Sequence, residues 1–166
     1  LDITRQSLGE SSERTATMYA NVAHNLNEQG RYSEAEPMYR RALEIQERVG
    51  GVNHPAYATT LINLGYNLRD DGRSEAAEPL MRQALGIFQA KFGDDNPETA
   101  WAYLSLGSTL GGLGRHAEGA GMTTKALEIR RRLLGENHPL TAVAYNSVAA
   151  ALVRGGGANG DKAAEP

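Results

Sequence analysis

Four histidines are the residues of this 166-residue chain that are best suited to bind a metal or to transfer a proton near neutral pH. His54 and His138 each stand directly before a proline, in matching places of the sequence. A residue there typically caps a helix, so we interpret both as caps or loop residues. We expect His116 at the surface, where a helix begins. The chain has no cysteine, which excludes a thiolate metal site and a thiol nucleophile.

Paired acids and glycine-rich runs could also indicate a catalytic or phosphate-binding site. Asp70-Asp71 and Asp94-Asp95 fall at expected helix ends and loops with no facing partner in a definable pocket, which argues against general acid–base catalysis. The runs 111–114 and 155–157 follow no strand and precede no Gly-Lys-Ser/Thr sequence, so they are not phosphate loops. Residues 130–132, three arginines, end a predicted helix, where positive charge suits the helix dipole. We therefore predict no enzyme activity, no cofactor and no metal.

The overall charge narrows the class of partner. The chain has 17 Lys and Arg against 20 Asp and Glu, a formal charge of −3, which argues against a nucleic-acid or anionic-membrane surface. It has no apolar run of membrane-spanning length and no secretory signal pattern. Together with the missing cysteines, this favours a cytoplasmic location. A high ratio of Arg to Lys, with abundant Ala and Gly, is typical of a GC-rich bacterial gene.

The glycines and prolines recur with a fixed period of 42 residues. A period between 20 and 50 residues is typical of repeat architectures. Two glycine columns are Gly30, Gly72, Gly114, Gly156 and Gly9, Gly51, Gly93, Gly135, and two proline columns are Pro55, Pro97, Pro139 and Pro37, Pro79.

Apolar residues within one period have helical spacing. Leu61, Leu64 and Leu68 follow one helix face, and a second apolar series runs from Ala77 to Phe88. Each period thus predicts a helix, a tight glycine turn, a second helix and a short loop. We expect first-type helices at 13–28, 55–70, 97–112 and 139–154, and second-type helices at 33–49, 75–92 and 117–134.

The turn residues support these boundaries. Proline in the Pro55 column suits the first turn of a helix, and glycine in the Gly30 column suits the left-handed residue that ends one. Ser33 and Glu36 match a capping box for the second-type helix. Gly119 and Gly121 fall inside the second-type helix of the third repeat, which predicts a softer helix there.

The repeats divide the whole chain. Full repeats are expected at 9–50, 51–92 and 93–134, with a half repeat at 135–154. Residues 1–8 match the end of a second-type helix from a preceding repeat, which indicates a longer array. Residues 155–166 have no apolar period and are expected to form a flexible tail.

The small and large residues of these columns resemble the tetratricopeptide repeat. The small residues of the two helices are Ala23, Gly65, Gly107, Ala149 and Ala35, Ala77, Gly119, with a last alanine at Ala42, Ala84 and Ala126. The long period is similar to the variant in kinesin light chains and many bacterial repeat proteins, marked by residues 30–37 and 134–139. The resemblance implies an all-α fold, a right-handed α-solenoid of antiparallel helix pairs, here about 3.5 repeats in residues 1–154.

The resemblance also implies which side chains face a partner, namely those lying one, four, five and eight residues after the Ala16 column. Amides there offer a peptide backbone both a donor and an acceptor, and aromatic side chains offer an apolar anchor. Trp101 fits equally well as a packing residue. The predicted binding residues are Thr17, Asn21, His24, Thr59, Ile62, Asn63, Tyr66, Trp101, Leu104, Ser105, Ser108 and Asn146.

No Lys or Arg occurs at any of these partner-facing positions. We therefore expect no strong binding of acidic C-terminal tails, which some related proteins clamp with basic residues. The leading hypothesis is a non-enzymatic scaffold that binds a peptide or helix of a partner protein in a concave groove. The alternatives are self-assembly into a homo-oligomer through an exposed apolar face of the 139–154 helix, or a regulatory sensor arm of a larger multidomain protein.

Overall fold

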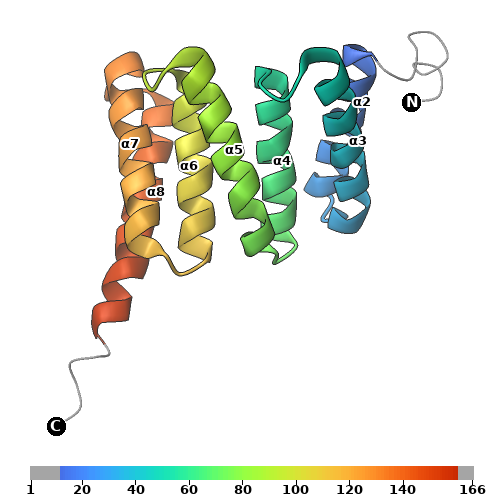
Figure 1. Ribbon diagram of the computed structural model, residues 1–166. Coiled ribbons are helices and arrows are strands. Elements are labelled where there is room, and N and C mark those ends of the chain that lie inside the picture. Colours follow the sequence, from blue (N-terminus) through green and yellow to red (C-terminus); the bar gives the residue numbers. More distant parts are fainter. Residues whose placement is uncertain (1–11, 161–166) are drawn as a thin grey trace. The chain divides into compact units, whose positions relative to one another are not determined.

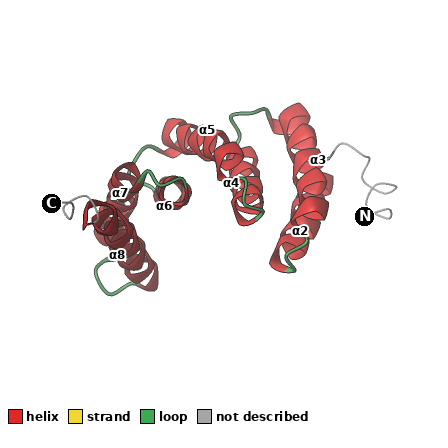
Figure 2. Cartoon of the chain, turned by 90° about the horizontal axis from the view of Figure 1, so that it is seen from below, coloured by secondary structure: helices red, strands yellow, loops and turns green. Residues whose placement is uncertain are grey.

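The computed structural model describes residues 12–160, and within that range the chain forms seven α-helices and no strand (Figure 1). Helices follow one another through short turns, as the alternating pattern predicts (Figure 2). The helices are α2 (Glu13–Glu28), α3 (Tyr32–Gly50), α4 (Pro55–Asp70), α5 (Ser74–Phe92), α6 (Pro97–Gly112), α7 (His116–Leu134) and α8 (Pro139–Gly160). The predicted all-α fold is confirmed.

The helix boundaries agree closely with the periodic pattern. The helices α2, α4 and α6 have the predicted ends, and the second-type helices α3, α5 and α7 each begin one residue earlier than predicted. The exception is α8, which continues to Gly160, so the predicted flexible tail is wrong for residues 155–160. Glycine disfavours a helix by about 1 kcal/mol but, unlike proline, keeps its N–H donor, so it does not stop a helix that is already formed. Residues 1–8 and 161–166 lie outside the described residues.

The chain divides into two compact units, residues 1–87 and 88–166, and the division falls within α5. In the first unit, α2 packs against α3 and α3 against α4. Its core includes Tyr39 of α3 and Leu64 and Leu68 of α4, each at most 2% exposed. In the second unit, α7 packs against both α6 and α8, with Leu106 and Leu110 of α6 fully or almost fully buried.

The residue before each helix-starting proline caps the helix, as predicted. Side-chain acceptors at this position receive a backbone N–H from two residues further on. These acceptors are His54 Nδ1 at 3.3 Å, Asn96 Oδ1 at 2.9 Å and His138 Nδ1 at 3.1 Å. These hydrogen bonds occupy the Nδ1 atoms, so both histidines act as helix caps.

A Schellman motif ends three of the first-type helices. Gly30, Gly72 and Gly114 have φ values of +72°, +79° and +75°, the left-handed conformation that favours glycine. The arginine after each glycine donates its backbone N–H to the carbonyl five residues earlier; the pairs are Arg31 to Leu26, Arg73 to Leu68 and Arg115 to Leu110, at 2.9, 2.7 and 3.0 Å. These bonds satisfy carbonyls that a helix end otherwise leaves without partners.

The predicted capping box at Ser33 and Glu36 does not form. The N-cap of α3 is Arg31, whose side chain makes no capping bond, and Ser33 lies inside the helix. The Glu36 carboxylate instead accepts from Arg73 at 2.7 Å and from Arg40 at 2.6 Å, and these two guanidinium groups lower its pKa. A capping box would require Ser33 to be the N-cap. Because the Schellman turn fixes the backbone at Arg31, the N-cap lies two residues earlier and the box does not form.

Small residues let the two helices of each repeat approach closely. A Cβ atom added at Gly119 of α7 would lie 2.7 Å from the carbonyl oxygen of Gly107 in α6. One added at Gly107 would lie 2.9 Å from the carbonyl oxygen of Gly119. In the first unit, Ala23 and Ala35 occupy the same two columns and are fully buried in one cluster. Gly119 therefore has a packing function in addition to its predicted effect on helix stability.

This contact predicts opposite effects for two glycines of the same helix. Gly119→Ala should destabilise the protein by about 1–3 kcal/mol, because the added methyl group meets backbone that is unable to move independently. Gly121→Ala should stabilise it by about 0.5–1 kcal/mol, because nothing lies within 4 Å of its added Cβ and alanine favours the helix. Urea unfolding of both variants measures the difference. Equal changes in the free energy of unfolding would contradict the close-contact explanation.

We also expect α7 to exchange its amide hydrogens faster than α3. Both are second-type helices, but α7 carries two interior glycines, Gly119 and Gly121, and α3 carries none before its last residue. Each interior glycine lowers helix stability by about 1 kcal/mol relative to alanine. Hydrogen exchange followed by mass spectrometry on peptides from each helix tests this, and equal or stronger protection of α7 would refute it.

Candidate protein-interaction surface

The first unit brings six predicted binding residues onto two helices that contact each other, α2 and α4. On α2 the side chains of Thr17, Asn21 and His24 are exposed. On α4 Thr59 is exposed, and Asn63 and Tyr66 are half-buried. Each threonine hydroxyl donates to the carbonyl four residues earlier in its own helix, at 3.0 Å for Thr17 and 3.2 Å for Thr59. Both hydroxyl oxygens keep acceptor capacity toward solvent.

An arginine lies beside this surface, although none occupies a predicted binding position. The guanidinium carbon of Arg69 lies 4.8 Å from the centre of the Tyr66 ring, a cation–π contact. Arg69 also pairs with Asp70 at 2.7 Å. Residues three apart on a helix are neighbours, so the spacing of Tyr66 and Arg69 was a signal available in the sequence. The arginine holds the ring in place while its charge is partly balanced by Asp70.

Three predicted binding residues are buried. Ile62 is fully buried, Leu104 is 9% exposed and Ser105 is 1% exposed. The Ser105 hydroxyl donates to the carbonyl oxygen of Trp101 at 2.9 Å, in its own helix. A partner lying on the surface would not reach these side chains, so the structure argues against their predicted role as exposed contacts. Removing large apolar side chains such as Ile62 and Leu104 from water is favourable, which explains their burial.

Trp101 is half-buried and packs against aromatic residues of the second unit. Its ring centroid lies 6.4 Å from that of Phe88, which lies 6.2 Å from that of Phe92. Phe92 remains 40% exposed. The packing interpretation of Trp101 therefore holds in the structure, although part of its surface stays accessible. Of the other predicted residues of this unit, Ser108 on α6 and Asn146 on α8 are exposed, on helices that contact each other.

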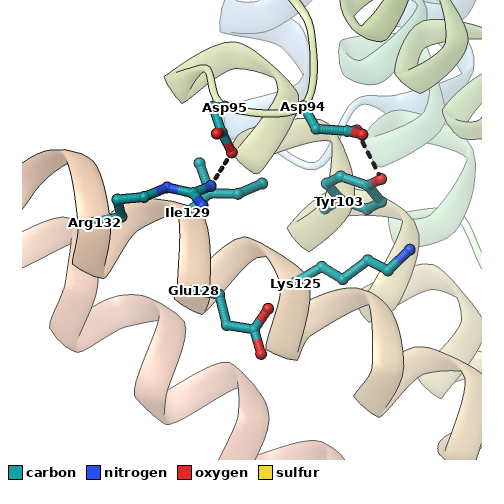
Figure 3. Close-up of a pocket in the computed structure, with 7 residues that line it drawn as sticks. All are labelled: Asp94, Asp95, Tyr103, Lys125, Glu128, Ile129 and Arg132. Carbon is teal, nitrogen blue, oxygen red and sulfur yellow. Dashed lines mark hydrogen bonds and ion pairs between the residues drawn. The ribbon is translucent and has the colours of Figure 1, made fainter.

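The second unit contains a polar pocket that the sequence pattern does not predict. It has a volume of about 180 Å³ and lies between the loop that follows α5 and the side chains of α6 and α7 (Figure 3). Its lining residues are Asp94, Asp95, Tyr103, Lys125, Glu128, Ile129 and Arg132. The prediction that Asp94-Asp95 faces no partner in a definable pocket is therefore wrong.

The acids of this pocket are engaged by neighbouring side chains. Asp94 Oδ1 accepts hydrogen bonds from Gln89 Nε2 at 2.8 Å and from the Tyr103 hydroxyl at 3.1 Å, which lower the pKa of Asp94. Burial, followed by the bond to Asp94, raises the pKa of Tyr103. Arg132 forms an ion pair with Asp95, and the Lys125 ammonium lies 5.5 Å from the centre of the Tyr103 ring. Asp94 is thus held as a hydrogen-bond acceptor rather than as a proton donor.

The same arrangement occurs one period later. The Tyr145 hydroxyl donates to Glu136 at 2.7 Å, and Arg131 pairs with Glu136 at 2.7 Å. These three residues follow Tyr103, Asp94 and Gln89 by 42 positions. The repetition indicates that both networks fasten the loop between repeats. The 42-residue spacing of Tyr103 and Tyr145 was the signal in the sequence that could have indicated these two networks.

A buried amide links consecutive repeats of the first unit. Asn67 of α4 is 1% exposed, and its Nδ2 donates to Asn27 Oδ1 at 2.9 Å and to the Tyr32 carbonyl at 3.2 Å. No periodic column contains this pair, so sequence reasoning could not identify it. Within the described part of the chain, no three His, Asp or Glu side chains gather closely enough to hold a metal ion. None of the helices described is both long and apolar enough to cross a membrane.

The Asp94 network predicts a pKa change. Tyr103→Phe removes one of the two donors to Asp94, so the pKa of Asp94 should rise toward its ordinary value while Gln89 keeps it from rising fully. A carboxyl whose folded pKa is depressed contributes stability above its unfolded pKa and loses it as the pH falls through the folded pKa, so the variant should lose less stability on acidification. Carboxyl titration by NMR checks the shift. Tyr145→Phe is the matched control, and a similar Asp94 shift in that variant would contradict the assignment.

Known proteins share this arrangement of helices. A family model described as tetratricopeptide repeat matches residues 1–48, 14–90, 63–120 and 98–158. A Podosopora anserina protein of the kinesin light chain type, with nearly identical TPR-like repeats, is 17% identical with a TM-score of 0.81, covering 87% of this chain and 69% of that chain. BtubC (BKLC) from P. vanneervenii is 25% identical with a TM-score of 0.82, covering 93% of this chain and 62% of that chain.

The chain thus spans roughly two thirds of the length of these solved structures. A search of curated proteins found no significant match. The family model covers well over half of the sequence, and the helix pairs, glycine turns and small-residue contacts agree with it. The chain belongs to the tetratricopeptide repeat family.

Proposed function

We propose that this chain is a non-enzymatic interaction module that holds a peptide or helix of a partner protein against the first-type helices α2 and α4. Tetratricopeptide repeats generally mediate protein–protein interactions, and their fold is typically a non-enzymatic scaffold. The observation that carries the proposal is a row of accessible side chains on α2 and α4 that includes no acid, lysine or arginine: Thr17, Asn21, His24, Thr59, Asn63 and Tyr66.

The chemistry of these residues fits a peptide backbone. Asn21 and Asn63 lie 42 positions apart, and each offers one carbonyl acceptor and two amide donors. A peptide that contacts both helices would replace some of its hydrogen bonds to water with hydrogen bonds to these two side-chain amides. Tyr66, fixed by Arg69, adds a rigid aromatic surface of the kind that often dominates binding energy.

The charge of this surface argues for a partner segment without a strong net charge. Its six side chains are formally uncharged apart from His24, and the neighbouring Arg69 already pairs with Asp70. A cluster of unpaired cations, which would be needed to hold a multiply charged acidic tail, does not occur among these positions. We therefore propose a neutral segment, bound mainly by amides and by the tyrosine ring.

The experiment compares partners captured by the wild-type chain and by Asn63→Ala combined with Tyr66→Ala. Loss of an aromatic anchor and an amide should reduce the recovery of specific partners about tenfold or more, as measured by quantitative mass spectrometry after pull-down. The matched control is Gln83→Ala, which removes an exposed amide from α5 without touching this surface. Unchanged recovery of every partner by the double variant would refute the assignment of this surface.

A further inference from the structure

The helix α8 exposes a large apolar surface. Tyr145 is 39% exposed, Leu140 45%, Val143 51%, Leu152 61% and Val153 75%. From Pro139 to Val153 the helix contains no charged residue. Large apolar side chains that stay in water at this density mark a surface that another element is expected to cover.

The corresponding surface of α2 is covered by α3. Two core clusters describe this packing. Ala16 and Tyr19 of α2 lie in one cluster with Ala42 and Ile45 of α3, and Ala23 and Leu26 of α2 lie in another with Ala35 and Tyr39 of α3. Under this cover Ala16 and Ala23 are fully buried and Tyr19 is 9% exposed.

Four residues of α2 contact α3 in these clusters, namely Ala16, Tyr19, Ala23 and Leu26. The corresponding residues of α8 are identical to them. They lie 126 positions, three periods, later in the chain: Ala142, Tyr145, Ala149 and Leu152. All four are exposed. Thr141 and Val148 also match Thr15 and Val22, whereas Ala150 replaces His24 and Val143 replaces Thr17. The identity therefore includes all four of these positions that α3 covers in α2. The internal helices α4 and α6 differ there, with Gly65 and Gly107 in place of the alanine at position 149.

We propose that α8 binds an amphipathic helix with the apolar pattern of α3. That pattern is a small residue, an aromatic residue, a second small residue and a branched apolar residue at positions i, i+4, i+7 and i+10, as in Ala35, Tyr39, Ala42 and Ile45. The small residues allow close approach to Ala149 and Ala142, and the larger ones cover Tyr145 and Leu152. The α2–α3 interface has the same four residues on its α2 side, so a helix with the apolar pattern of α3 fits the exposed surface of α8.

The peptide YSEAEPMYRRALEIQERVG, the sequence of α3, is the probe for this surface. Labelled with fluorescein and titrated with the full chain, it should show saturable binding by anisotropy. The variant Ala149→Leu should weaken binding about tenfold or more, because a large side chain at the point of close approach prevents packing. Ala150→Leu is the matched control, since Ala150 is equally apolar and exposed but corresponds to the exposed His24. It should leave the affinity unchanged.

Changes in the peptide give a second set of controls. Tyr39→Ala in the peptide should weaken binding by a similar factor, because Tyr39 is 1% exposed in the α2–α3 contact. Arg48→Ala, at an exposed position, should have no effect. Absence of binding to the wild-type chain, or binding that survives Ala149→Leu, would overturn the proposal.

Light scattering separates the proposed partner helix from a second copy of the chain. A mass that rises with concentration in the wild-type chain and in Ala150→Leu, but not in Ala149→Leu, would assign this surface to self-association and overturn the proposed occupant. The double variant Asn63→Ala, Tyr66→Ala should bind the α3 peptide like the wild-type chain. The two proposals can therefore fail independently.

Discussion

The fold depends on how closely the two helices of one repeat can approach each other. In the second unit the carbonyl oxygens of Gly107 and Gly119 occupy the space where side chains would otherwise begin. In the first unit Ala23 and Ala35 fill the same columns, and the side chain of Met81 lies against Gly65. Because helices packed this closely exclude water from the contact, the larger apolar residues on either side are buried as well. The remaining face of each first-type helix is left for other contacts.

The turn between the two helices of a repeat must bring them together in the same way each time. The glycine of each Schellman turn ends the first helix of a repeat. The arginine that follows it lies just before the second helix, and its side chain is exposed. Arg31 pairs with Glu34 of the next helix, while Arg73 reaches back to Glu36. Exposed ion pairs of this kind contribute little stability individually. Their positions follow from the turn, and they keep the outer surface polar while the amides of α2 and α4 stay accessible.

Much of the fold could be predicted from the sequence because its signals are local or periodic. The prolines and their capping residues set the starts of α4, α6 and α8, and the glycines set the ends of α2, α4 and α6. The proposed binding surface was less predictable, because helical spacing assigns a residue to a face of its helix but does not show how much of that face other elements cover. Ile62 and Leu104 lie at predicted contact positions and are nevertheless buried. The Asn67–Asn27 bond and the pairing of Glu36 with Arg73 join distant residues outside any shared column.

The ion pairs Glu36–Arg73 and Asp95–Arg132 each join residues 37 positions apart, the first between consecutive repeats and the second between the start and the end of the third repeat. Such links, like the small-residue contacts, require that Glu36 and Arg132 keep their angles around α3 and α7, and that Arg73 and Asp95 keep their places in the turns before α5 and α6. One residue inserted within a helix turns everything beyond it by about 100° and moves it by about 1.5 Å, which separates these partners. A complete 42-residue unit inserted at a loop restores every angle. Proteins of this design are therefore expected to change length in evolution by gaining or losing whole repeats, with shorter insertions confined to the loops.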